Sequence, residues 1–360
     1  MAKSDVLQLP NLVINDDDYQ AGSVKLLETL RGSWQAEDVI FKVFTEGITN
    51  KLFRVHNKND PGLKDAIVFR LYGLKTDLII DRDSEKKNMQ LLHAFGYCAP
   101  LLASFKNGIA YGFAKGECLD EKSVRDPHVS SLVARAMVQM HSVDPSKLGK
   151  EFEMDREPCI FKKTQTFLEL APDSFEDPAK NEKLKKTVPS KETLQEELNL
   201  LEKHLSVLGS PVVFSHNDIL LKNIVFNKET DSVSFIDYEY GAFNYEAHDI
   251  GNHFCEWAGI DTVDYNLYPD KATQLPWLRH YLEYKYEMNG RNSSEVTEKD
   301  LETLYVQANK FALMGHFFWG IWALIQSRYS AIDFDYLEYS KIRLDEYFAK
   351  KEQFLALKMP

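Results

Sequence analysis

The sequence predicts an α+β protein in which a small antiparallel β lobe precedes a large, mainly helical lobe. Its 360 residues exceed the usual size of one compact core, so two lobes are expected. β-type runs and turns are concentrated between about residues 38 and 116, whereas the chain from residue 245 onward is mostly helical and aromatic. We therefore place the lobes at residues 1–116 and 117–360, with a crevice between them that suits a small molecule.

In the first lobe, a polar lead and a short helix in GSVKLLETLRGSW precede the strands. Two β-type runs, residues 39–44 and 51–55, flank a turn and predict a hairpin. A third strand, AIVFRLYG, is followed by a helix for which Asp83 is the expected N-cap. A second hairpin is centred on Asn107-Gly108, a dipeptide that strongly favours tight hairpin turns.

The second lobe begins with an amphipathic helix in SSLVARAMVQMHSV. Residues 171–192 are charged and contain proline, which predicts a loop or an insertion. The stretch ETLQEELNLLEKHLSVLG places leucines at helical spacing and ends at Gly209, the expected C-cap. Short β-type runs occupy residues 212–237, and YEAHDIGNHFCEWAG and FALMGHFFWGIWALI predict two helices.

Composition excludes several classes of protein. A formal charge of -12 argues against non-specific nucleic-acid binding. The first residues lack the basic start and apolar core of a signal peptide, so a cytoplasmic protein is expected. The most apolar stretch, residues 311–325, is shorter than the roughly 20 residues of a membrane span and predicts a buried helix. The four cysteines form no C-x-x-C pair, so neither a zinc nor a redox motif is indicated.

Three polar residues follow apolar strands at a spacing that suits phosphoryl transfer. Asp218 ends PVVFS, Asn223 lies five positions later, and Asp237 ends VSFI. A carboxylate accepts the proton of an attacking hydroxyl, and a carboxamide with a second carboxylate holds Mg²⁺. The Asp-to-Asn step equals that in the protein-kinase pattern H-R-D-x-x-x-x-N. The alternative is that these are ordinary strand-end turn residues, which would explain each one singly but not the joint pattern.

Longer motifs make the resemblance specific. SPVVFSHNDILLKNIVFN, FIDYEYGAFNYEAHDIGNHFCEWAG and KFALMGHFFWGIWALIQSRYS together resemble the choline/ethanolamine kinase family, from about FTEGITNKLFRV to RLDEYF. Within that family, HNDILLKNI, LIIDRDSE and TEGITNKL resemble the ethanolamine branch. The resemblance implies a protein-kinase-like two-lobe fold, with ATP as co-substrate and Mg²⁺ as the metal.

The resemblance also implies residue roles around ATP and the metal. Asp218 is the implied general base, and the implied magnesium ligands are Asn223, Asp237 and Glu239. The loop over the phosphates contains Gly47, Ile48, Thr49 and Asn50, and Arg70 corresponds to a position that contacts phosphate oxygens. Glu85 is expected either to orient Arg70 or to form an ordinary ion pair with it.

Three features depart from the wider patterns. The loop TEGITNK has one glycine where protein kinases have three, and Asn217 stands where they have the arginine before the catalytic aspartate. Activation through a phosphorylated loop paired with that arginine is therefore not supported. Gly112 and Leu220 replace glutamines that choline kinases use near the nucleotide, which puts those ATP contacts in doubt.

The acceptor site is implied by two later helices. Asp249, Asn252, His253 and Glu256 share one helix face at i, i+3, i+4 and i+7, which alone would suit a solvated stripe, while a metal site at Asp249 and His253 lacks further ligands. Trp319 and Trp322 also share a face, which alone would suit a core. By resemblance, an amino-alcohol pocket is formed by Asp218, Asp249, Glu256, Trp319, Trp322 and Tyr339. Acids and aromatic faces suit an ammonium group.

The sequence thus predicts a kinase that phosphorylates ethanolamine with Mg·ATP, on the way to phosphatidylethanolamine. A choline or dual-specificity kinase is the nearest alternative, because the pocket residues do not separate the two substrates. An aminoglycoside-type or protein kinase is a more distant alternative, and a protein kinase should show D-F-G and A-P-E segments, neither of which is present. A catalytically dead binding module would be expected to lack one of Asp218, Asn223 or Asp237. No motif decides whether the chain forms a homodimer.

Overall fold

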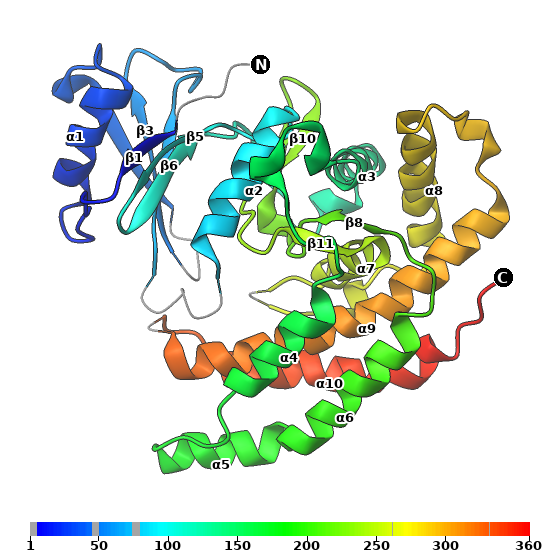
Figure 1. Ribbon diagram of the computed structural model, residues 1–360. Helices are drawn as coiled ribbons and strands as arrows, with labels where there is room; N and C mark the ends of the chain where they lie inside the picture. Colours follow the sequence, from blue (N-terminus) through cyan, green and yellow to red (C-terminus); the bar gives the residue numbers. More distant parts are fainter. Residues whose placement is uncertain (1–5, 45–49, 74–79, 261, 331) are drawn as a thin grey trace. The chain divides into compact units, whose positions relative to one another are not determined.

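The computed structural model describes residues 6–44, 50–73, 80–260, 262–330 and 332–360. The chain divides into two compact units, Met1–Glu117 and Cys118–Pro360. The first is built mainly from strands and the second mainly from helices (Figure 1). This composition confirms the α+β class, with a β-rich part that precedes a helical part.

The first unit is organised around one six-stranded sheet with the order β1-β5-β6-β4-β3-β2. The pairs β2/β3, β3/β4, β4/β6 and β5/β6 are antiparallel, as predicted, whereas β1 pairs in parallel with β5, so the sheet is mixed. Its strands are β1 (Leu7–Leu9), β2 (Val39–Phe44), β3 (Lys51–Asn57), β4 (Ile67–Leu71), β5 (Leu101–Phe105) and β6 (Gly108–Gly112), and its helices are α1 (Tyr19–Leu30) and α2 (Arg82–Ala94).

Both predicted hairpins are confirmed. β2 and β3 pair from Val39 opposite Asn57 to Phe44 opposite Leu52. β5 and β6 are joined at Lys106-Asn107, and the Asn107 side chain does more than turn the chain. Its Nδ2 donates to the Ile14 carbonyl at 2.8 Å, and its Oδ1 accepts from the Ile14 N–H at 3.0 Å. The hairpin therefore also fixes the lead segment before α1.

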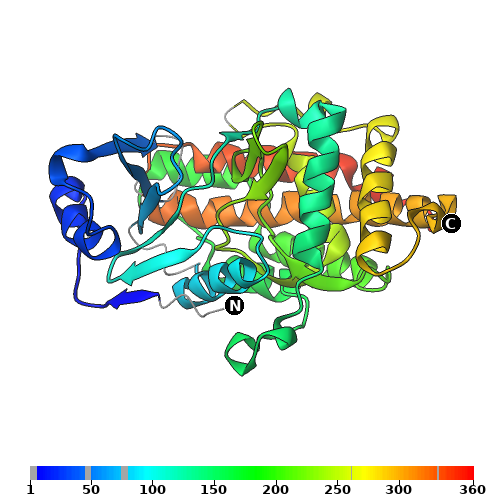
Figure 2. The same ribbon diagram turned by 90° about the horizontal axis from the view of Figure 1, so that it is seen from above.

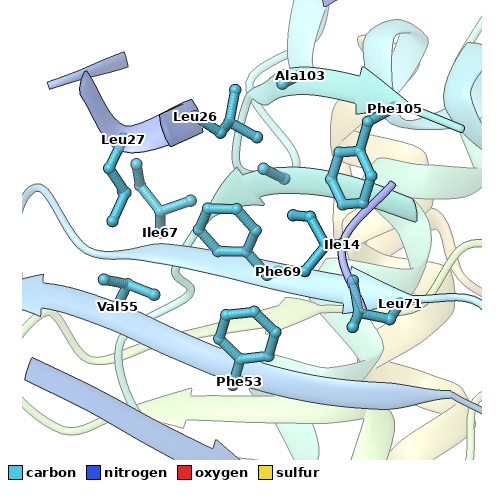
Figure 3. Close-up of a cluster of buried hydrophobic side chains, with 11 residues drawn as sticks. Ile14, Leu26, Leu27, Phe53, Val55, Ile67, Phe69, Leu71, Ala103 and Phe105 are labelled. Carbon is cyan, nitrogen blue, oxygen red and sulfur yellow. The ribbon is translucent and has the colours of Figure 1, made fainter. Parts of the chain in front are cut away.

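An apolar cluster fills the space between α1 and the sheet (Figure 3). Phe53 and Phe69 stack with their ring centroids 5.1 Å apart, and Leu26 and Leu27 of α1 cover them. Alternate residues of β3, Phe53 and Val55, are buried in this cluster, because successive side chains of a strand point to opposite faces of the sheet. This packing supports the sheet on which Arg70 lies.

Helix α2 begins two residues earlier than predicted. Asp81, not Asp83, is the N-cap, and its Oδ1 accepts from the N–H groups of Asp83 and Ser84. The N-cap must lie just outside the helix with its side chain reaching the N2 and N3 amides. Asp83 lies inside the first turn, where its charge favours the helix dipole.

The second unit contains eight α-helices within its described residues and several short strands. A three-stranded sheet has the order β10-β9-β7, and β11 pairs with β8. The strands are β7 (Glu117–Cys118), β8 (Val212–Ser215), β9 (Ile224–Asn227), β10 (Ser232–Phe235) and β11 (Ala242–Tyr245). The helices are α3 (Pro127–His141), α4 (Ile160–Leu170), α5 (Pro178–Thr187), α6 (Lys191–Leu205), α7 (Glu246–Glu256), α8 (Lys271–Met288), α9 (Glu298–Tyr329) and α10 (Tyr336–Leu355).

The apolar stretch 311–325 lies inside α9, which is buried along most of its length, as predicted. Helix α10 runs back alongside α9 in the same unit (Figure 2), and α7 also packs on α9. Among the described residues, no helix is both long and apolar enough to cross a bilayer.

Two local predictions were wrong in this unit. The stretch expected to be a loop contains α5, which Asp177 caps and Pro178 begins, because proline is tolerated in the first turn of a helix. Helix α6 buries its four leucines as predicted but ends at Leu205 with Ser206 as its C-cap. Gly209, at φ +69°, lies three residues beyond that C-cap and turns the chain toward β8.

The crossing of α7 and α9 depends on Gly251. A Cβ atom at this position would lie 2.3 Å from the Ala308 carbonyl oxygen and 2.8 Å from the Ala312 nitrogen, both backbone atoms. We expect Gly251→Ala to lower the free energy of unfolding by about 2 kcal/mol or more, although alanine normally stabilises a helix. Chemical denaturation would measure this, with the exposed Gly62→Ala as a control, since that position has 3.6 Å of clearance. Equal stability of the two variants would contradict the close crossing.

Candidate active site

Asp218 lies in the loop 216–223 that follows β8. The residue before it, Asn217, adopts a left-handed backbone with φ +66°, which asparagine tolerates better than most residues. The Asn217 carboxamide donates to the Tyr240 carbonyl at 3.0 Å and accepts from Asn244 Nδ2 at 2.7 Å. These contacts fix the backbone immediately before Asp218.

Asn223 closes the loop beside Asp218. Its Nδ2 donates to the Asp218 carbonyl at 2.9 Å and to Asp218 Oδ2 at 3.1 Å, so its Oδ1 is turned away from Asp218. The Asn223 carbonyl accepts from the Ile236 N–H at 3.0 Å, and the Ile236 carbonyl accepts from His216 Nε2 at 3.0 Å. The segment that leads to Asp237 is thereby bonded to both ends of the loop.

The oxygen atoms near Asp237 suit a divalent metal. Asp237 has φ +67°, a left-handed conformation that aspartate visits more readily than bulky residues, and its carboxylate oxygen lies within 4.8 Å of one of Glu239. Ligands of one Mg²⁺ ion, each about 2.1 Å from it, lie at most roughly 4.2 Å apart, so a small side-chain adjustment suffices. Asn223 Oδ1 would be the third ligand by resemblance, and a donor set made of oxygens alone would fit magnesium rather than zinc.

Burial raises the pKa of Asp218 well above its usual value, and the negative charges of Asp237, Glu256 and Glu239 raise it further. The hydrogen bond from Asn223 acts in the opposite direction. A carboxyl group with a raised pKa is a better proton acceptor once it is ionised. The structure therefore brings the predicted base into the electrostatic range of the other predicted acids.

An aromatic cluster adjoins these carboxylates. Trp319 Nε1 donates to Asn252 Oδ1 at 2.9 Å, and Trp322 Nε1 donates to the Tyr240 hydroxyl at 2.8 Å. Because both indole N–H groups are used, only the ring faces and edges remain for other contacts. The Tyr240 ring lies 5.3 Å from that of Trp319, and the charges of Glu239 and Asp218 add to the effect of burial in raising the Tyr240 pKa.

Glu256 is a paired acid rather than a lone one. Arg343 donates from Nη2 to Glu256 Oε1 at 2.8 Å, and the two side chains are 1% and 4% exposed. The Arg343 guanidinium also lies 5.7 Å from the ring centre of Tyr339. Both Glu256 and Asp218 contribute to raising the pKa of Tyr339, after the larger effect of burial. Glu256 and Tyr339 thus lie within electrostatic range of Asp218, and their implied role in an acceptor pocket stays a prediction.

Asp249 holds the backbone of the loop 216–223. Its Oδ2 accepts from the His216 N–H at 2.8 Å, and its Oδ1 accepts from the Asn217 N–H at 2.7 Å. It is fully buried, and both oxygens are engaged, so an ammonium group would have to displace backbone donors to reach it. The structure therefore shows a role for Asp249 in shaping the loop, and its implied substrate contact stays a prediction. All of α7 is buried, which also excludes the solvated stripe.

In the first unit, Arg70 on β4 and Glu85 on α2 form a buried ion pair with Nη1 and Oε1 2.5 Å apart. Arg82 donates to the other Glu85 oxygen at 3.1 Å and to Asn50 Oδ1 at 3.3 Å. Its guanidinium also covers the ring of Tyr72 at 4.1 Å. The pairing of Arg70 with Glu85 is confirmed, and guanidinium groups of this kind bind phosphate oxygens in proteins.

The remaining residues of the predicted phosphate loop, Gly47, Ile48 and Thr49, lie outside the described residues. Asn50 is described, and its Oδ1 also accepts from the Gly73 N–H at 3.3 Å. This contact ties the end of the loop to the end of β4. It was not visible in the sequence because 23 residues separate the two partners.

Sequence reasoning missed several residues of the site. Arg343 and Tyr240 carried no motif signal of their own, although Arg343 lies four positions after Tyr339 and so shares its helix face. Arg82 was detectable in principle, because it lies one turn before Glu85 at the start of α2. His141, which contacts Asp249 at 3.0 Å, ends a helix that had been read only as amphipathic.

Comparison with known proteins assigns a family to this arrangement. The model of the family described as choline/ethanolamine kinase matches residues 41–348. Ethanolamine kinase 1 of Homo sapiens is 43% identical over 356 residues, covering 97% of this chain and 76% of that protein.

Solved structures agree. An ethanolamine kinase of Plasmodium vivax has a TM-score of 0.78 at 26% identity, covering 96% of this chain and 93% of that one. A choline kinase of Cryptosporidium parvum has a TM-score of 0.75 at 24% identity, covering 93% of this chain and 97% of that one. The second likeness is one of fold alone, and together they confirm the expected kinase-like fold.

Proposed function

We propose, from the premise that this chain belongs to the choline/ethanolamine kinase family, that it transfers the γ-phosphoryl group of ATP to the hydroxyl group of ethanolamine. The observation that carries the proposal is the place of Asp218, a buried carboxylate held by Asn223 beside both an acidic and an aromatic cluster. The product would be phosphoethanolamine, the precursor that phosphatidylethanolamine synthesis consumes.

In this mechanism, Asp218 accepts the proton of the acceptor hydroxyl as the oxygen attacks the γ-phosphorus in line. Asn223, Asp237 and Glu239 would hold Mg²⁺, which when bound neutralises charge on the phosphate oxygens. Arg70 would contact ATP phosphate oxygens, and Glu85 would keep its guanidinium oriented. In this division, residues 1–116 serve the nucleotide, and residues 117–360 carry the base, the metal ligands and the acceptor site.

The acceptor's ammonium group would lie among Trp319, Trp322, Tyr339 and Glu256. Since Glu256 Oε1 already accepts from Arg343, the contact with the ammonium falls to its Oε2 and to the aromatic faces. A cation against an aromatic face gains roughly 0.5–2 kcal/mol. A primary ammonium also needs acceptors for three N–H groups, and Glu256 Oε2 would supply one of them.

Choline is the second candidate, because the two indole rings present faces and not donors to the pocket. A quaternary ammonium has no N–H groups to satisfy and is well matched by aromatic faces alone. The names of the relatives favour ethanolamine. The proposal also includes a cytoplasmic location and, as an open alternative, a homodimer, which sedimentation would test.

A coupled ADP-release assay separates these candidates. We expect acceptor-dependent release with Mg·ATP that is much faster for ethanolamine than for choline, and that is lost when the metal is chelated. Equal or faster turnover with choline would overturn the substrate assignment and leave the kinase assignment in place. Release that does not depend on either acceptor would overturn both.

A further inference from the structure

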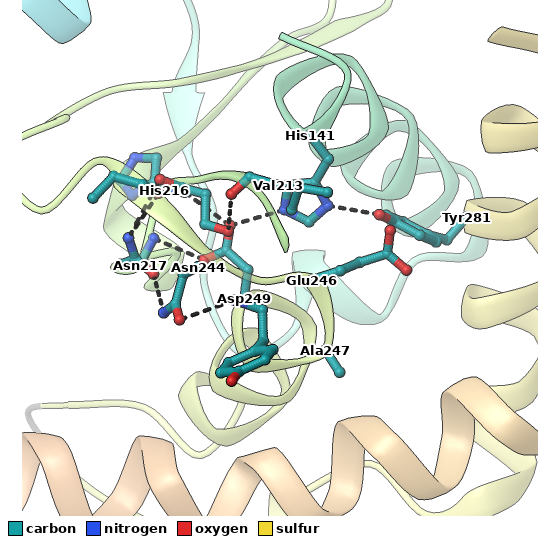
Figure 4. A network of polar contacts seen from close by, with 12 residues as sticks. His141, Val213, His216, Asn217, Asn244, Glu246, Ala247, Asp249 and Tyr281 are labelled. Atoms are coloured by element: carbon teal, nitrogen blue, oxygen red, sulfur yellow. Dashed lines mark hydrogen bonds and ion pairs between the residues drawn. The ribbon is translucent and has the colours of Figure 1, made fainter. Parts of the chain in front are cut away.

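A chain of buried polar contacts continues from the loop 216–223 to helix α8 (Figure 4). Asp249, which holds the loop, accepts at Oδ2 from His141 Nε2 at 3.0 Å. The other ring nitrogen of His141, Nδ1, lies 2.6 Å from the Tyr281 hydroxyl. All three side chains are buried, so this contact is shielded from water. The proposed mechanism makes no use of Tyr281.

The protons along this chain can be accounted for. An ionised carboxylate only accepts hydrogen bonds, so His141 Nε2 carries the proton that faces Asp249. Burial would raise the pKa of Asp249, but the hydrogen bond and charge of His141 bring it below its usual value, in keeping with the ionised form. Tyr281 then donates to Nδ1 of a neutral His141, or accepts from Nδ1 of a protonated one. In either case the Tyr281 hydroxyl is the group that holds the ring.

Helices α7 and α8 also contact each other at the Tyr281 end of this row of polar contacts. Glu246 of α7 is buried next to Tyr281, and its charge and hydrogen bonding, after burial, raise the Tyr281 pKa. Lys285, one turn after Tyr281, donates to Glu246 Oε2, and its side chain is 27% exposed. The carboxylates at the two ends, Asp249 and Glu246, lie three residues apart on α7. A polar path therefore runs from a partly exposed ammonium group to the loop.

We propose that Tyr281 is a positioning residue for catalysis: its hydroxyl holds His141, and through His141 the Asp249 carboxylate, in the geometry that shapes the loop bearing Asp218. The expected effect on kcat rests on the proposed function, whereas the effect on the loop geometry does not. None of the residues assigned to ATP, metal or acceptor lies on helix α8, yet this helix supplies the contact that holds His141, which in turn holds Asp249. Loss of the hydroxyl would leave His141 Nδ1 without a partner in a buried site, and the ring would be free to rotate.

The test compares Tyr281→Phe with Tyr284→Phe on the same helix. Phenylalanine keeps the ring that stacks on Trp277 with centroids 5.8 Å apart, so folding is preserved. We expect kcat to fall roughly tenfold to a hundredfold, the effect of a small misplacement of reacting groups, with KM for either substrate within about twofold. Hydrogen exchange at the His216 and Asn217 amides should accelerate. Tyr284, half-buried beside Arg135 at 5.4 Å, should leave all of these unchanged when its hydroxyl is removed.

A double-mutant cycle separates positioning from general destabilisation. His141→Gln keeps an N–H donor near Asp249 but removes the nitrogen that meets Tyr281, so it should reproduce the loss seen in Tyr281→Phe. The double variant should lose no more activity than either single variant, because both break the same link. Additive losses, or losses that follow the melting temperature alone, would overturn the proposal. Unchanged kcat and unchanged exchange in Tyr281→Phe would do so too.

The exchange measurement also keeps this inference separable from the proposed function. If the protein released no ADP with ethanolamine or choline, the kinase proposal would fail. Faster exchange at the two loop amides in Tyr281→Phe, but not in Tyr284→Phe, would still support the positioning role. Active enzyme with unaltered exchange in both variants would leave the proposed function standing and remove this inference.

Discussion

Replacing Asp218 with asparagine is expected to lower kcat by roughly 10³-fold or more, the size of a general-base contribution. Asparagine has nearly the same shape, but it cannot accept the proton of the attacking hydroxyl. The backbone contacts that hold the loop do not involve this side chain, so the loop should persist. Binding of Mg·ATP, measured by titration calorimetry, should change little.

The same replacement should stabilise the protein in the absence of nucleotide and metal. The folded-state pKa of Asp218 is raised, so the folded protein binds this proton more tightly than the unfolded chain, whose value is roughly 3.9. The stability that comes from this group is therefore present below the unfolded pKa and is lost as pH rises through the folded pKa. At pH 8, Asp218→Asn removes a buried charge among like charges, and its melting temperature should exceed that of the wild type. The difference should shrink toward pH 4.

Asp231→Asn is a matched control for both effects. This residue is exposed in the turn between β9 and β10 and also has a left-handed backbone, φ +48°, which asparagine accepts. We expect wild-type kcat from it and no gain in stability at pH 8. Normal turnover in Asp218→Asn would refute the base assignment, while a lower melting temperature at pH 8 would refute the electrostatic account.

The second large effect is expected from Asp249→Asn, which should cost about 3 kcal/mol of folding stability and at least tenfold in kcat. Each carboxylate oxygen accepts from a backbone N–H, and one accepts from His141 as well. A carboxamide has one oxygen and one nitrogen, so in either orientation its own N–H groups face another donor. The loop must shift to relieve this, and Asp218 shifts with it.

Denaturation and steady-state kinetics would measure both losses in Asp249→Asn. Asp270→Asn is the control, since Asp270 caps α8 from the surface and asparagine caps a helix about as well as aspartate. A stable and fully active Asp249→Asn variant would show that the loop does not depend on this carboxylate. A variant with normal turnover but a raised KM for ethanolamine would instead favour the substrate contact that the family resemblance implied.

The sequence predicted best those features that nearby residues determine. The hairpin at Asn107-Gly108 and the leucines of α6 were correct because turn chemistry and helical periodicity act over a few positions. Helix α5 was missed because its sequence lacks such a periodic signal. It is charged, buries only Leu184 and begins with a proline, so it has no apolar face to reveal it.

In the site too, contacts between nearby residues could be predicted, and contacts between distant residues could not. Asp218 and Asn223 are five positions apart, and their contact follows from that short spacing. The Glu256–Arg343 pair joins residues 87 positions apart, so only the packing of α7, α9 and α10 brings them together. The contacts of Asp249 with the loop backbone could not be predicted, because a shared helix face says which residues point the same way but not what lies there. Its partners, His216 and Asn217, are brought to it only by long-range packing.

Helix α7 limits how the acceptor specificity of such an enzyme can change. In its first turn Asp249 holds the loop that bears Asp218, at its end Glu256 is proposed to bind the acceptor, and between them Gly251 packs closely against α9. A rotation or shift of α7 would move Asp249 and Glu256 together. A change of acceptor that required α7 to move would therefore also disturb the loop that bears Asp218. Re-engineering toward larger ammonium alcohols should therefore vary Tyr339 on α10 before Trp319 on α9, because Trp319 is hydrogen-bonded to Asn252 of α7.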